Sequence, residues 1–565
     1  MNKNTPNTIS IDEKVAEFGE LAKKKYKIPA NSDFKLPDRT WPDKDIEKAP
    51  IWCSVDLRDG NQSIEKPMNV EQKLEYFNML VQMGFKEIEV GFPAASTDDY
   101  DFIRKIIEEN LIPDDVKIQV LVGCKRELIE KTRKSIEGAK NVIVHLYNST
   151  STIQREVVFE KSQDEIIKLA EDGVDWIKKY FKDFDGNLQL EYSPESFTGT
   201  EIKFAVEICK RVINKWDSFG GKDIIFNLPA TVENSTPDRY ADKIEYMSRE
   251  LKSYIKKISE TVKVIISVHT HNDRGTAIAA TELAIKAGAD RVEGIIGVPN
   301  GERSGNVDIG TVALNMFTQG VSPGLDLSNI GEISEKISEI IEIPIHPRYP
   351  YTGELVHTAY SGGHIDAIAK GLDKQEEREK KGNLFWDVPY LPINPKDIGL
   401  EYEPVGINSQ SGIGGVKYKL KKMGYDIPKE MKESIKDIFT PIIEEISGVL
   451  TPEKIKDIFE KNFVNINGPI SIDEFDFDQI REDGRKNGHG TINEASNYIG
   501  KIFGIQFEII YYSQESQSEG KNANAVTYFK IEYNEKLYFG FGIDIDYEKS
   551  AMKGLISTIN IALRK

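Results

Sequence analysis

The sequence predicts an α/β protein made of a (β/α)8 TIM barrel, a helical linker region and a C-terminal α+β domain. First, strand-like apolar runs alternate with helix-length segments from Ile51 to about Leu314, which is typical of a parallel α/β fold. Second, polar motifs follow these runs, at the end of the strands where the active sites of such barrels assemble. Third, a chain of 565 residues is too long for one domain and suits a barrel of about 250 residues with accessory modules.

Eight apolar runs are expected to form the strands of the barrel. They cover residues 51–56, 86–90, 117–122, 141–145, 189–192, 223–226, 262–268 and 291–296. From about residue 325 the alternation stops and the segment is polar, which favours a helical linker. From about Ile470 we expect two strand-plus-helix units whose helices cover 490–499 and 547–556, the second after strands at 525–531 and 536–540. The predicted domains are an N-terminal extension (1–45), the barrel (46–325), linker subdomains (326–465) and a C-terminal domain (466–565).

The composition is typical of a soluble protein without a polyanionic partner. A net charge of −18 and a pI near 5.1 disfavour binding to nucleic acid or to an anionic membrane, because both would repel the chain. Three cysteines without zinc spacing indicate a reducing compartment. No run approaches the roughly 18 apolar residues of a membrane span. Residues 1–27 contain no Arg and mix acidic residues with Lys, which argues against a cleaved targeting peptide. We therefore expect a cytoplasmic protein.

Two motifs at strand ends indicate a metal site beside an anion-binding residue. His269 and His271 are two residues apart on a predicted strand, so both imidazoles project to the same face and can chelate one ion. Asp59 adds an oxygen ligand from the turn after the first strand, and Arg58 beside it can hold a carboxylate. Each motif alone has a purely structural alternative, a paired His-x-His or a salt-bridged loop. Their combination favours a divalent metal with positions open for substrate.

Six segments carry a resemblance to a known enzyme family. They are residues 36–42, 49–60, 191–200, 225–233, 300–306 and 408–411. In these segments the chain resembles the long-form α-isopropylmalate synthases, which belong to the metal-dependent Claisen-condensing and lyase barrel superfamily. The resemblance covers most of the chain. It implies an acyltransferase of leucine biosynthesis that condenses acetyl-CoA with 2-oxoisovalerate, hydrolyses the thioester and releases 2-isopropylmalate and CoA.

The resemblance also implies roles for individual residues. The implied metal ligands are Asp59, His269, His271 and Asn306; the implied catalytic residues are Arg58, Glu195, His364 and Tyr402, with Glu302 as an alternative base; the implied substrate-binding residues are Leu121, His145, Ser193, Asn227, Pro229 and Thr231; and the implied effector-binding residues are Gly520, Ala523 and Ala525. The metal would be Mg²⁺, with Mn²⁺ or Zn²⁺ as alternatives, acetyl-CoA would be the co-substrate, and K⁺ activation is possible. A homodimer inhibited by leucine is expected, with linker residues acting in the partner's barrel.

The chain departs from the family pattern in its linker and C-terminal region. Gly406 and Ile413 stand where the family usually has basic residues, and the loop from Gln517 to Ala525 differs from the usual effector-binding sequence. Other functions therefore stay open: a paralogue for another 2-oxo acid, of the citramalate or homocitrate type, a CoA lyase, or a non-catalytic allosteric homologue. The intact metal ligands argue against the silent homologue, and the C-terminal module argues against a lyase. A homocitrate synthase would need a further basic residue that the predicted acceptor positions lack.

Overall fold

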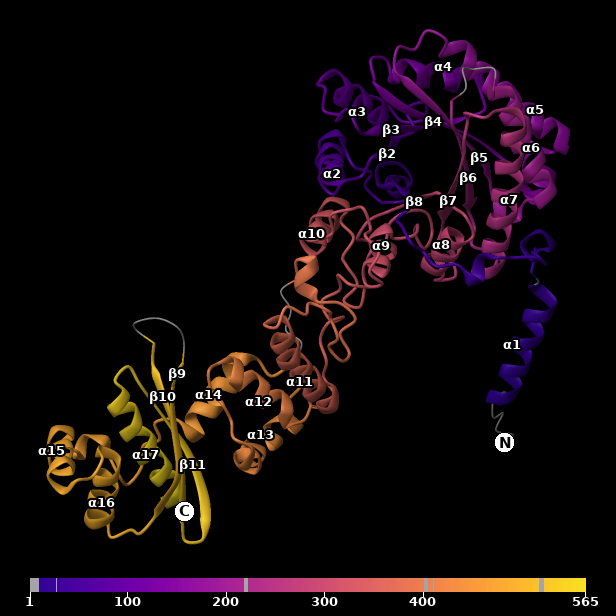
Figure 1. The fold of residues 1–565 in the computed structure, drawn as a ribbon. Helices are drawn as coiled ribbons and strands as arrows, with labels where there is room; N and C mark the ends of the chain where they lie inside the picture. The colour runs from indigo at the N-terminus through magenta and orange to yellow at the C-terminus, as the bar shows by residue number, and fades with distance from the viewer. Residues whose placement is uncertain are drawn as a thin grey trace, which may run out of the picture. The chain divides into compact units, whose positions relative to one another are not determined.

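The chain divides into two compact units, which are described separately. The computed structural model describes residues 10–26, 28–217, 222–400, 405–409, 411–517 and 523–564 (Figure 1). One unit comprises residues 1–356 and 395–401, and the other comprises residues 357–394 and 402–565. The segment predicted to be the linker thus contributes residues to both units. None of the helices in the described part of the chain has the length and hydropathy of a membrane span.

The first unit is a closed barrel of eight parallel strands, as predicted. Each strand pairs with the next one along the chain, and β8 pairs with β1. The strands are β1 (Ile51–Ser54), β2 (Glu87–Gly91), β3 (Lys117–Gly123), β4 (Asn141–Ser149), β5 (Asn187–Glu195), β6 (Ile224–Ala230), β7 (Val264–Thr270) and β8 (Arg291–Gly294). Strands β4 to β7 run past their predicted ends, because polar residues there continue the hydrogen-bonded ladder towards the mouth of the barrel.

Amphipathic helices surround the barrel in Figure 1. They are α2 (Val70–Gln82), α3 (Thr97–Glu108), α4 (Arg126–Ser135), α5 (Gln163–Tyr180), α6 (Ile202–Asp217), α7 (Pro237–Ile258), α8 (Ala277–Lys286) and α9 (Ile309–Phe317). Local sequence fixes several of their starts: α2 and α5 each begin with a reciprocal capping box, Asn69 with Gln72 and Ser162 with Glu165. Two further helices of this unit are α1 (Ile11–Lys25) and α10 (Ile330–Ile341).

Residues 31–41, here called the N-terminal strap, are fastened to α7 by buried carboxylates. Asp242 accepts hydrogen bonds from the Leu36 backbone at 3.0 Å and from the Trp41 indole at 2.8 Å. Glu245 accepts from the backbone amide of Thr40 at 2.9 Å. The strap also reaches the loops at the barrel mouth, since the Asn31 amide donates to Thr152 Oγ1 at 2.7 Å. It therefore ties α7 to the loop that follows β4.

The second unit combines the linker helices with a C-terminal three-stranded sheet. Its helices are α11 (Gly362–Glu379), α12 (Ile413–Lys422), α13 (Lys432–Glu445), α14 (Pro452–Phe463), α15 (Phe477–Asn487), α16 (Thr491–Phe503) and α17 (Tyr547–Leu563). Its strands are β9 (Glu508–Ser516), β10 (Ala525–Tyr533) and β11 (Lys536–Asp544), antiparallel and in the order β11-β10-β9. The helical linker and the C-terminal α+β region are both as predicted.

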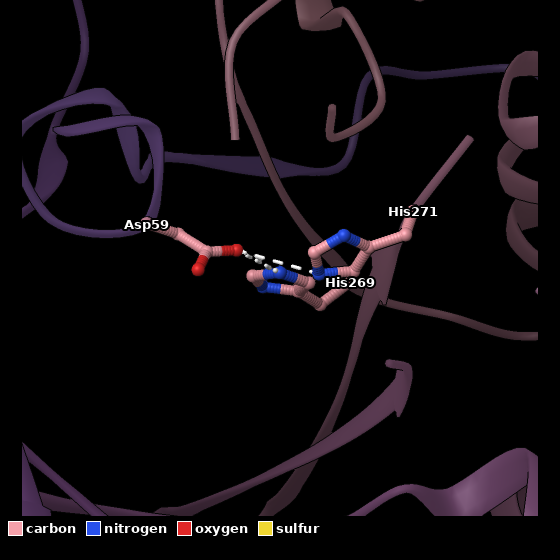
Figure 2. A group of neighbouring side chains, drawn as sticks. All are labelled: Asp59, His269 and His271. Atoms are coloured by element: carbon pink, nitrogen blue, oxygen red, sulfur yellow. Dashed lines mark hydrogen bonds and ion pairs between the residues drawn. The ribbon is translucent and has the colours of Figure 1, made fainter. Parts of the chain in front are cut away.

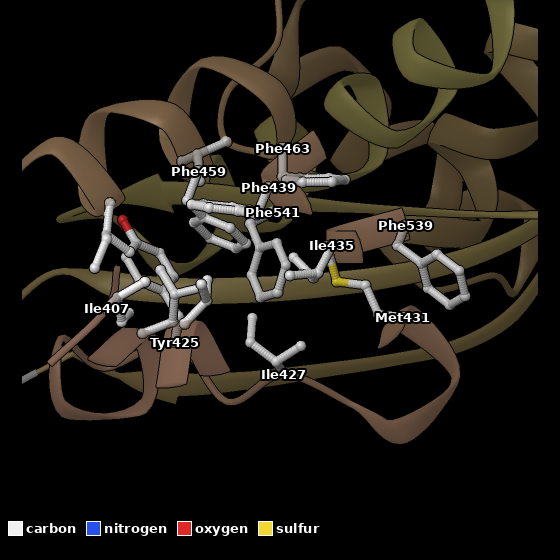
Figure 3. Close-up of a cluster of buried hydrophobic side chains, with 14 of the residues drawn as sticks. Ile407, Tyr425, Ile427, Met431, Ile435, Phe439, Phe459, Phe463, Phe539 and Phe541 are labelled. Carbon is white, nitrogen blue, oxygen red and sulfur yellow. The ribbon is translucent and has the colours of Figure 1, made fainter. Parts of the chain in front are cut away.

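The two faces of this sheet belong to different hydrophobic cores. Because side chains alternate along a strand, Phe529 and Ile531 face one core with α17, while Val526 and Tyr528 face the other. The second core, shown in Figure 3, joins the sheet to linker residues such as Tyr425. The linker helices and the sheet thus share one buried core rather than forming separate bodies.

Glycines allow α17 to lie directly on β11. A Cβ on Gly542 would stand 2.0 Å from the Ser550 carbonyl oxygen, and one on Gly540 would stand 2.5 Å from Thr558 Oγ1. No larger residue fits at either position without separating the helix from the strand. The two glycines are therefore explained by this close packing of helix on strand.

The prediction of a repeated strand-plus-helix unit is wrong for its first copy. Helix α15, not a strand, precedes α16: Asp476 caps it by accepting from the amides of Asp478 and Gln479, and Gly488 at φ 74° ends it. The next strand, β9, follows α16 and joins the single sheet. The polar, charged sequence of residues 477–487 lacks the alternation of apolar and polar residues that a strand would need, and the N-cap residue Asp476 favours a helix.

Candidate functional site

Three predicted metal ligands meet at the mouth of the barrel. His269 lies at the end of β7, His271 follows that strand, and Asp59 lies in a π-helical turn, η3 (Asp56–Gly60), just after β1. Asp59 Oδ2 is 3.0 Å from His269 Nε2 and 3.4 Å from His271 Nε2. Figure 2 shows the Asp59 carboxylate pointing at both imidazoles. All three side chains are buried, and their ligand atoms are close enough to hold one metal ion.

The charges at this site favour an ionised Asp59. Burial would raise the pKa of Asp59, but the Arg58 guanidinium at 2.9 Å and hydrogen bonds from His269 and His271 together hold the pKa well below its usual range. Burial opposes the imidazolium of His269, yet its bonds to Asp59 and Glu293 outweigh burial and raise the pKa of His269 to about 9. An incoming cation would therefore displace a proton from His269.

Glu293 orients His269 from below. Its carboxylate lies 2.8 Å from His269 Nδ1, and it also accepts from the Asn227 amide at 2.9 Å and from Arg291 at 2.8 Å. Burial would raise the pKa of Glu293, but Arg291 and His269 lower it well below its usual range. A carboxylate on Nδ1 leaves Nε2 of His269 to face Asp59, which is the arrangement that metal-binding histidines adopt.

Asn306 completes the group and provides the test of fit. Its Nδ2 lies 2.7 Å from Asp59 Oδ2 and 2.7 Å from His269 Nε2, while its Oδ1 has no hydrogen-bond partner in the described part of the chain. The amide oxygen and nitrogen exchange places by a half-turn, which would present the oxygen to the same point. Two imidazoles, a carboxylate and an amide oxygen form a donor set that suits a divalent cation. The residues present therefore fit a metal.

Buried contacts fix the turn that carries Arg58 and Asp59. Asp56 accepts from Ser54 Oγ and Tyr76 Oη, and from the Ile296 amide of the loop after β8. The buried Lys73 ammonium donates to the Leu57 carbonyl at 3.0 Å and to Asp99 at 2.5 Å. The turn after β1 is thus tied to the loop after β8, which carries Asn306.

A cavity of about 340 Å³ opens above these ligands. Its lining includes Arg58, Asp59, His269 and His271, together with the predicted residues Leu121, His145, Ser193, Glu195, Asn227, Pro229, Thr231 and Glu302. The predicted barrel residues are therefore brought together, with Asn306 in contact with Asp59 and His269. Four lining residues were not predicted: Gln62, Phe92, Tyr147 and Arg303. They lie next to predicted motifs, but nothing in their spacing marked them.

Arg303 is a basic residue in this lining whose guanidinium is already engaged. It has a left-handed backbone with φ 58°, and its Nε donates to Asp273 at 2.7 Å. It also donates to the Thr231 carbonyl oxygen. The loop after β8 is thereby joined to the loops after β6 and β7. Arg303 therefore holds three loops together at the edge of the cavity, and its charge is already paired with Asp273.

A layer of charged residues beneath the cavity was also missed by the sequence reading. Glu89 accepts from Arg58 at 2.5 Å and lies 2.7 Å from His145 Nδ1, while His145 Nε2 contacts Ser193 Oγ at 2.7 Å. Arg291 donates to Glu87 at 2.6 Å. The signal was present, because charged residues recur at every second position inside buried runs such as 87–89 (Glu, Glu) and 291–293 (Arg, Glu), and those side chains point into the barrel.

The predicted linker and effector residues lie in the second unit or outside the described residues. His364 lies in the first turn of α11 and stacks on Tyr390, with ring centroids 4.0 Å apart. Tyr402 and Gly520 lie outside the described residues. Ala525 is buried at the start of β10, beside Ala523 in the chain. Gly406, one of the departures, packs against Tyr360 so closely that a Cβ would stand 2.3 Å from the ring, which explains why no basic side chain occurs there.

The second unit contains a separate cavity of about 500 Å³. It lies where the first turns of α16 and α17 approach β9, and is lined by residues including Thr491, Asn493, Tyr512, Gln514 and Tyr547. Ala523 and Ala525 are not among its lining residues.

Comparisons with known proteins match three successive parts of the chain to family models. Residues 49–337 match the HMGL-like family, residues 354–421 match the alpha-isopropylmalate synthase post-catalytic domain-like family, and residues 464–563 match the LeuA allosteric (dimerisation) domain. The 2-isopropylmalate synthase of Acetoanaerobium sticklandii is 44% identical over 560 residues, covering 95% of this chain and 96% of the relative. The chain belongs to the 2-isopropylmalate synthase family.

Two further family members support this assignment. The 2-isopropylmalate synthase of Clostridium acetobutylicum is 44% identical over 93% of this chain and 97% of its own length. That of Helicobacter hepaticus is 45% identical, again over 93% of this chain and 97% of its own. The resemblance inferred from the sequence motifs is confirmed. A solved HMG-CoA lyase from Brucella melitensis aligns with 52% of this chain and 99% of its own at 16% identity, with a TM-score of 0.40 that carries no functional argument.

Proposed function

We propose that this chain condenses acetyl-CoA with 2-oxoisovalerate and hydrolyses the thioester, giving 2-isopropylmalate and CoA. The observation that carries the proposal is the 44% identity to a 2-isopropylmalate synthase over 95% of the chain. The cavity at the barrel mouth supports it, because a possible metal site and the Arg58 guanidinium lie side by side there. The reaction needs both a polarised ketone and a group that stabilises negative charge.

Asp59, His269, His271 and Asn306 are the proposed metal ligands, and Mg²⁺ is the proposed ion. A bound divalent ion would supply Lewis-acid polarisation of the ketone carbonyl. Mn²⁺ or Zn²⁺ are alternatives, and K⁺ is proposed as an activator. Arg58 stabilises the negative charge that develops on oxygen as the new bond forms. Its bonds to Asp59 and Glu89 hold it in place before substrate arrives.

The acceptor binds in the part of the cavity lined by Leu121, His145, Ser193, Asn227 and Pro229. Leu121 and Pro229 provide the apolar wall that an isopropyl group needs. Thr231 and Glu195 are proposed to position the substrate by hydrogen bonds: Thr231 Oγ1 already accepts from the Ser196 amide at 2.9 Å, and Glu195 accepts from Ser149. Arg303 is engaged by Asp273, so a second acceptor carboxylate finds no free cation among the described lining residues.

Carbon–carbon bond formation needs a base for the methyl group of acetyl-CoA. The base removes a methyl proton, the methyl carbon bonds to the ketone carbon, and the ketone oxygen gains a proton to become a hydroxyl. Water then attacks the thioester and CoA leaves as the thiol. We propose His364 of the linker as the base, with Tyr402 assisting, and Glu302 on the cavity wall as the alternative.

The second unit is proposed to serve in dimerisation and in inhibition by leucine. Its match to the LeuA allosteric (dimerisation) domain supports a homodimer under allosteric control. The cavity beside α16 and α17 suits a small zwitterion, because helix N-termini favour a carboxylate and the apolar side chains of Ile492 and Met552 also line it. We accordingly propose this cavity as an effector site in addition to the predicted Gly520, Ala523 and Ala525. A cytoplasmic location is likewise proposed.

The test is CoA release from acetyl-CoA across a panel of 2-oxo acids. With Mg²⁺, the full-length protein should release CoA faster with 2-oxoisovalerate than with any other acceptor. His271→Ala should lower the rate by orders of magnitude while leaving the circular dichroism spectrum unchanged. Preference for pyruvate or 2-oxoglutarate would instead assign the chain to a paralogous synthase, and cleavage of an acyl-CoA without condensation would assign it to a lyase.

A further inference from the structure

The two edges of the C-terminal sheet differ in how they are covered. At the β11 edge, Val464 forms a bridge with Phe541, and the Asn465 amide donates to the Phe541 carbonyl at 2.9 Å. The Asn465 side chain continues this cover, because its Oδ1 accepts from the Ile543 amide at 2.9 Å. The chain itself thus caps the backbone of β11.

The β9 edge is open in the described part of the chain. Among those residues β9 pairs only with β10, so its outer backbone groups have no strand partner. Three consecutive apolar side chains are exposed on this strand: Ile510 by 40%, Tyr511 by 54% and Tyr512 by 49%. Because neighbours alternate, both faces of the strand present apolar surface. This nine-residue edge strand contains no Lys, Arg or Pro; its charges are Glu508 and Glu515 near its two ends, and its one irregularity against β10 is a register shift at Ile510.

We propose that β9 pairs with β9 of a second copy of this chain, joining the two C-terminal sheets into one antiparallel sheet. The inference rests on the homodimer proposed above and specifies where its subunits meet, and it is independent of the substrate. The match of residues 464–563 to a dimerisation domain supports a second copy as the occupant. Figure 1 shows the three-stranded sheet that would be extended.

The register of this pairing follows from symmetry. A two-fold axis through Tyr512, the central residue of β9 (Glu508–Ser516), is the choice that overlaps the whole strand. Tyr512 then faces its own symmetry mate, and Tyr511 faces Ser513.

A cysteine on the axis tests both the interface and its register. In an antiparallel pair the Cα atoms of directly opposed residues lie about 4.5 to 5.5 Å apart, a span that a disulfide bridges. Under mild oxidation, full-length Tyr512→Cys should form a disulfide-linked dimer that a reducing agent dissolves. The wild type provides the background, which includes any crosslinking through the partly exposed Cys124; Cys53 and Cys209 are buried. Leu537→Cys, at an exposed position of β11, is the matched control and should stay uncrosslinked.

Sedimentation of the wild type, measured beside the crosslinking, separates the possible failures. If the wild type is a dimer but Tyr512→Cys crosslinks no faster than Leu537→Cys, the subunits meet elsewhere and the β9 interface is wrong. If the wild type is a monomer at the assay concentration, the homodimer fails together with the interface. Condensation activity of the wild type, measured in the same samples, reports on the catalytic proposal alone. Circular dichroism confirms that both cysteine variants are folded.

Discussion

His269 is the residue on which the candidate metal site depends most. One side of its ring faces Glu293 and the other faces Asp59 and Asn306, so every polar atom of the imidazole is engaged. These partners raise its pKa to about 9. A metal ion and a proton therefore compete for the same nitrogen, and this competition can be measured.

Metal binding should release close to one proton per ion at neutral pH. Below a pKa of about 9 His269 carries the proton that the ion displaces, so metal affinity should rise with pH and level off above about 9. Isothermal titration calorimetry with Mg²⁺ or Mn²⁺ in buffers of different ionisation enthalpy measures the proton count directly. A binding enthalpy that is the same in every buffer would contradict the assignment.

Glu293→Gln should weaken metal binding by about 10- to 100-fold, because the carboxylate orients His269 and raises its basicity. Glu87→Gln is the matched control: Glu87 lies in the same buried layer and contacts Arg291 and Lys117 but not His269. Equilibrium Mn²⁺ binding reads out both variants without assaying turnover. Equal losses of affinity in the two variants would mean that the layer acts only through general stability.

At the scale of residues, the sequence was most informative where a motif lies at a strand end. Asp59, His269 and His271 could be grouped because strand periodicity sets the direction of their side chains. The roles of Glu293 and Glu89 were not predicted, because a charged residue inside an apolar run has no visible partner in the sequence. Only the closed barrel brings Arg291 to Glu293 and Arg58 to Glu89. The place of Arg303 in the cavity lining was not predicted, because the direction of its side chain depends on a left-handed backbone conformation within a loop.

At the scale of elements, α7 holds a buried cation next to the active-site loops. The Lys243 ammonium donates to the Thr198 carbonyl at 2.8 Å and lies over the Phe197 ring. Burial lowers the pKa of Lys243 to about 7, with Glu201 opposing the shift. The Thr198 carbonyl also accepts from Ser32 of the N-terminal strap at 3.1 Å. Charge on Lys243 therefore bears on how α7, the strap and the turn after β5 pack.

Lys243→Met should show its greatest relative stability at low pH. The folded pKa of Lys243 lies below the unfolded value of 10.5, so the unfolded chain binds more protons between pH 7 and about 10.5. Over this pH range the free energy of unfolding of the wild type increases with pH, whereas that of the variant lacks this increase. The melting temperature of the variant minus that of the wild type should fall between pH 7 and 10. A difference independent of pH would show that burial does not lower the pKa of Lys243.

Elements were predicted well where periodicity was strong and poorly where capping decided. All eight barrel strands were predicted from apolar runs. The polar ends of β4 to β7 at the barrel mouth were cut short, whereas the runs for β1 and β8 were taken two residues too far. The segment containing α15 was assigned to a strand-plus-helix unit, although Asp476 and Gly488 carry ordinary helix-cap signals. Local sequence was a better guide than the expected repeat at that point.

At the scale of the molecule, the barrel carries the metal ligands while His364 belongs to the other compact unit. A fragment of residues 1–356 should therefore bind metal but condense acetyl-CoA at least about 100-fold more slowly than the full chain, since general acid–base catalysis contributes at least that factor. Metal titration and CoA release on the same sample measure the two properties.

Two comparisons make the result with the fragment specific to His364. Full-length His364→Asn should show a similar loss of condensation with unchanged metal affinity. Glu302→Gln in the full chain should retain most of its activity if His364 is the base. A fragment as active as the full chain, or an inactive Glu302→Gln with an active His364→Asn, would transfer the role of base to the barrel.

The order of the architecture was predictable from the sequence, but the grouping of its parts into compact units was not. Alternating runs predicted the barrel and their loss predicted the linker. Residues 326–356 nonetheless belong to the barrel unit, and the later linker helices share a core with the sheet. Such grouping depends on contacts between residues far apart in the chain, such as Tyr425 with Phe541, which no local pattern encodes.

That shared core determines how an engineer could release the enzyme from the proposed inhibition by leucine. Deleting residues from 466 onward would remove Phe539 and Phe541 from this core. Tyr425, Phe459 and Ile435 of the linker region would then be exposed to water. A shortened enzyme made for amino-acid overproduction should therefore aggregate instead of running free of feedback. Deregulated variants are better sought among single substitutions at the cavity beside α16 and α17, where the lining can change and the wall stays in place.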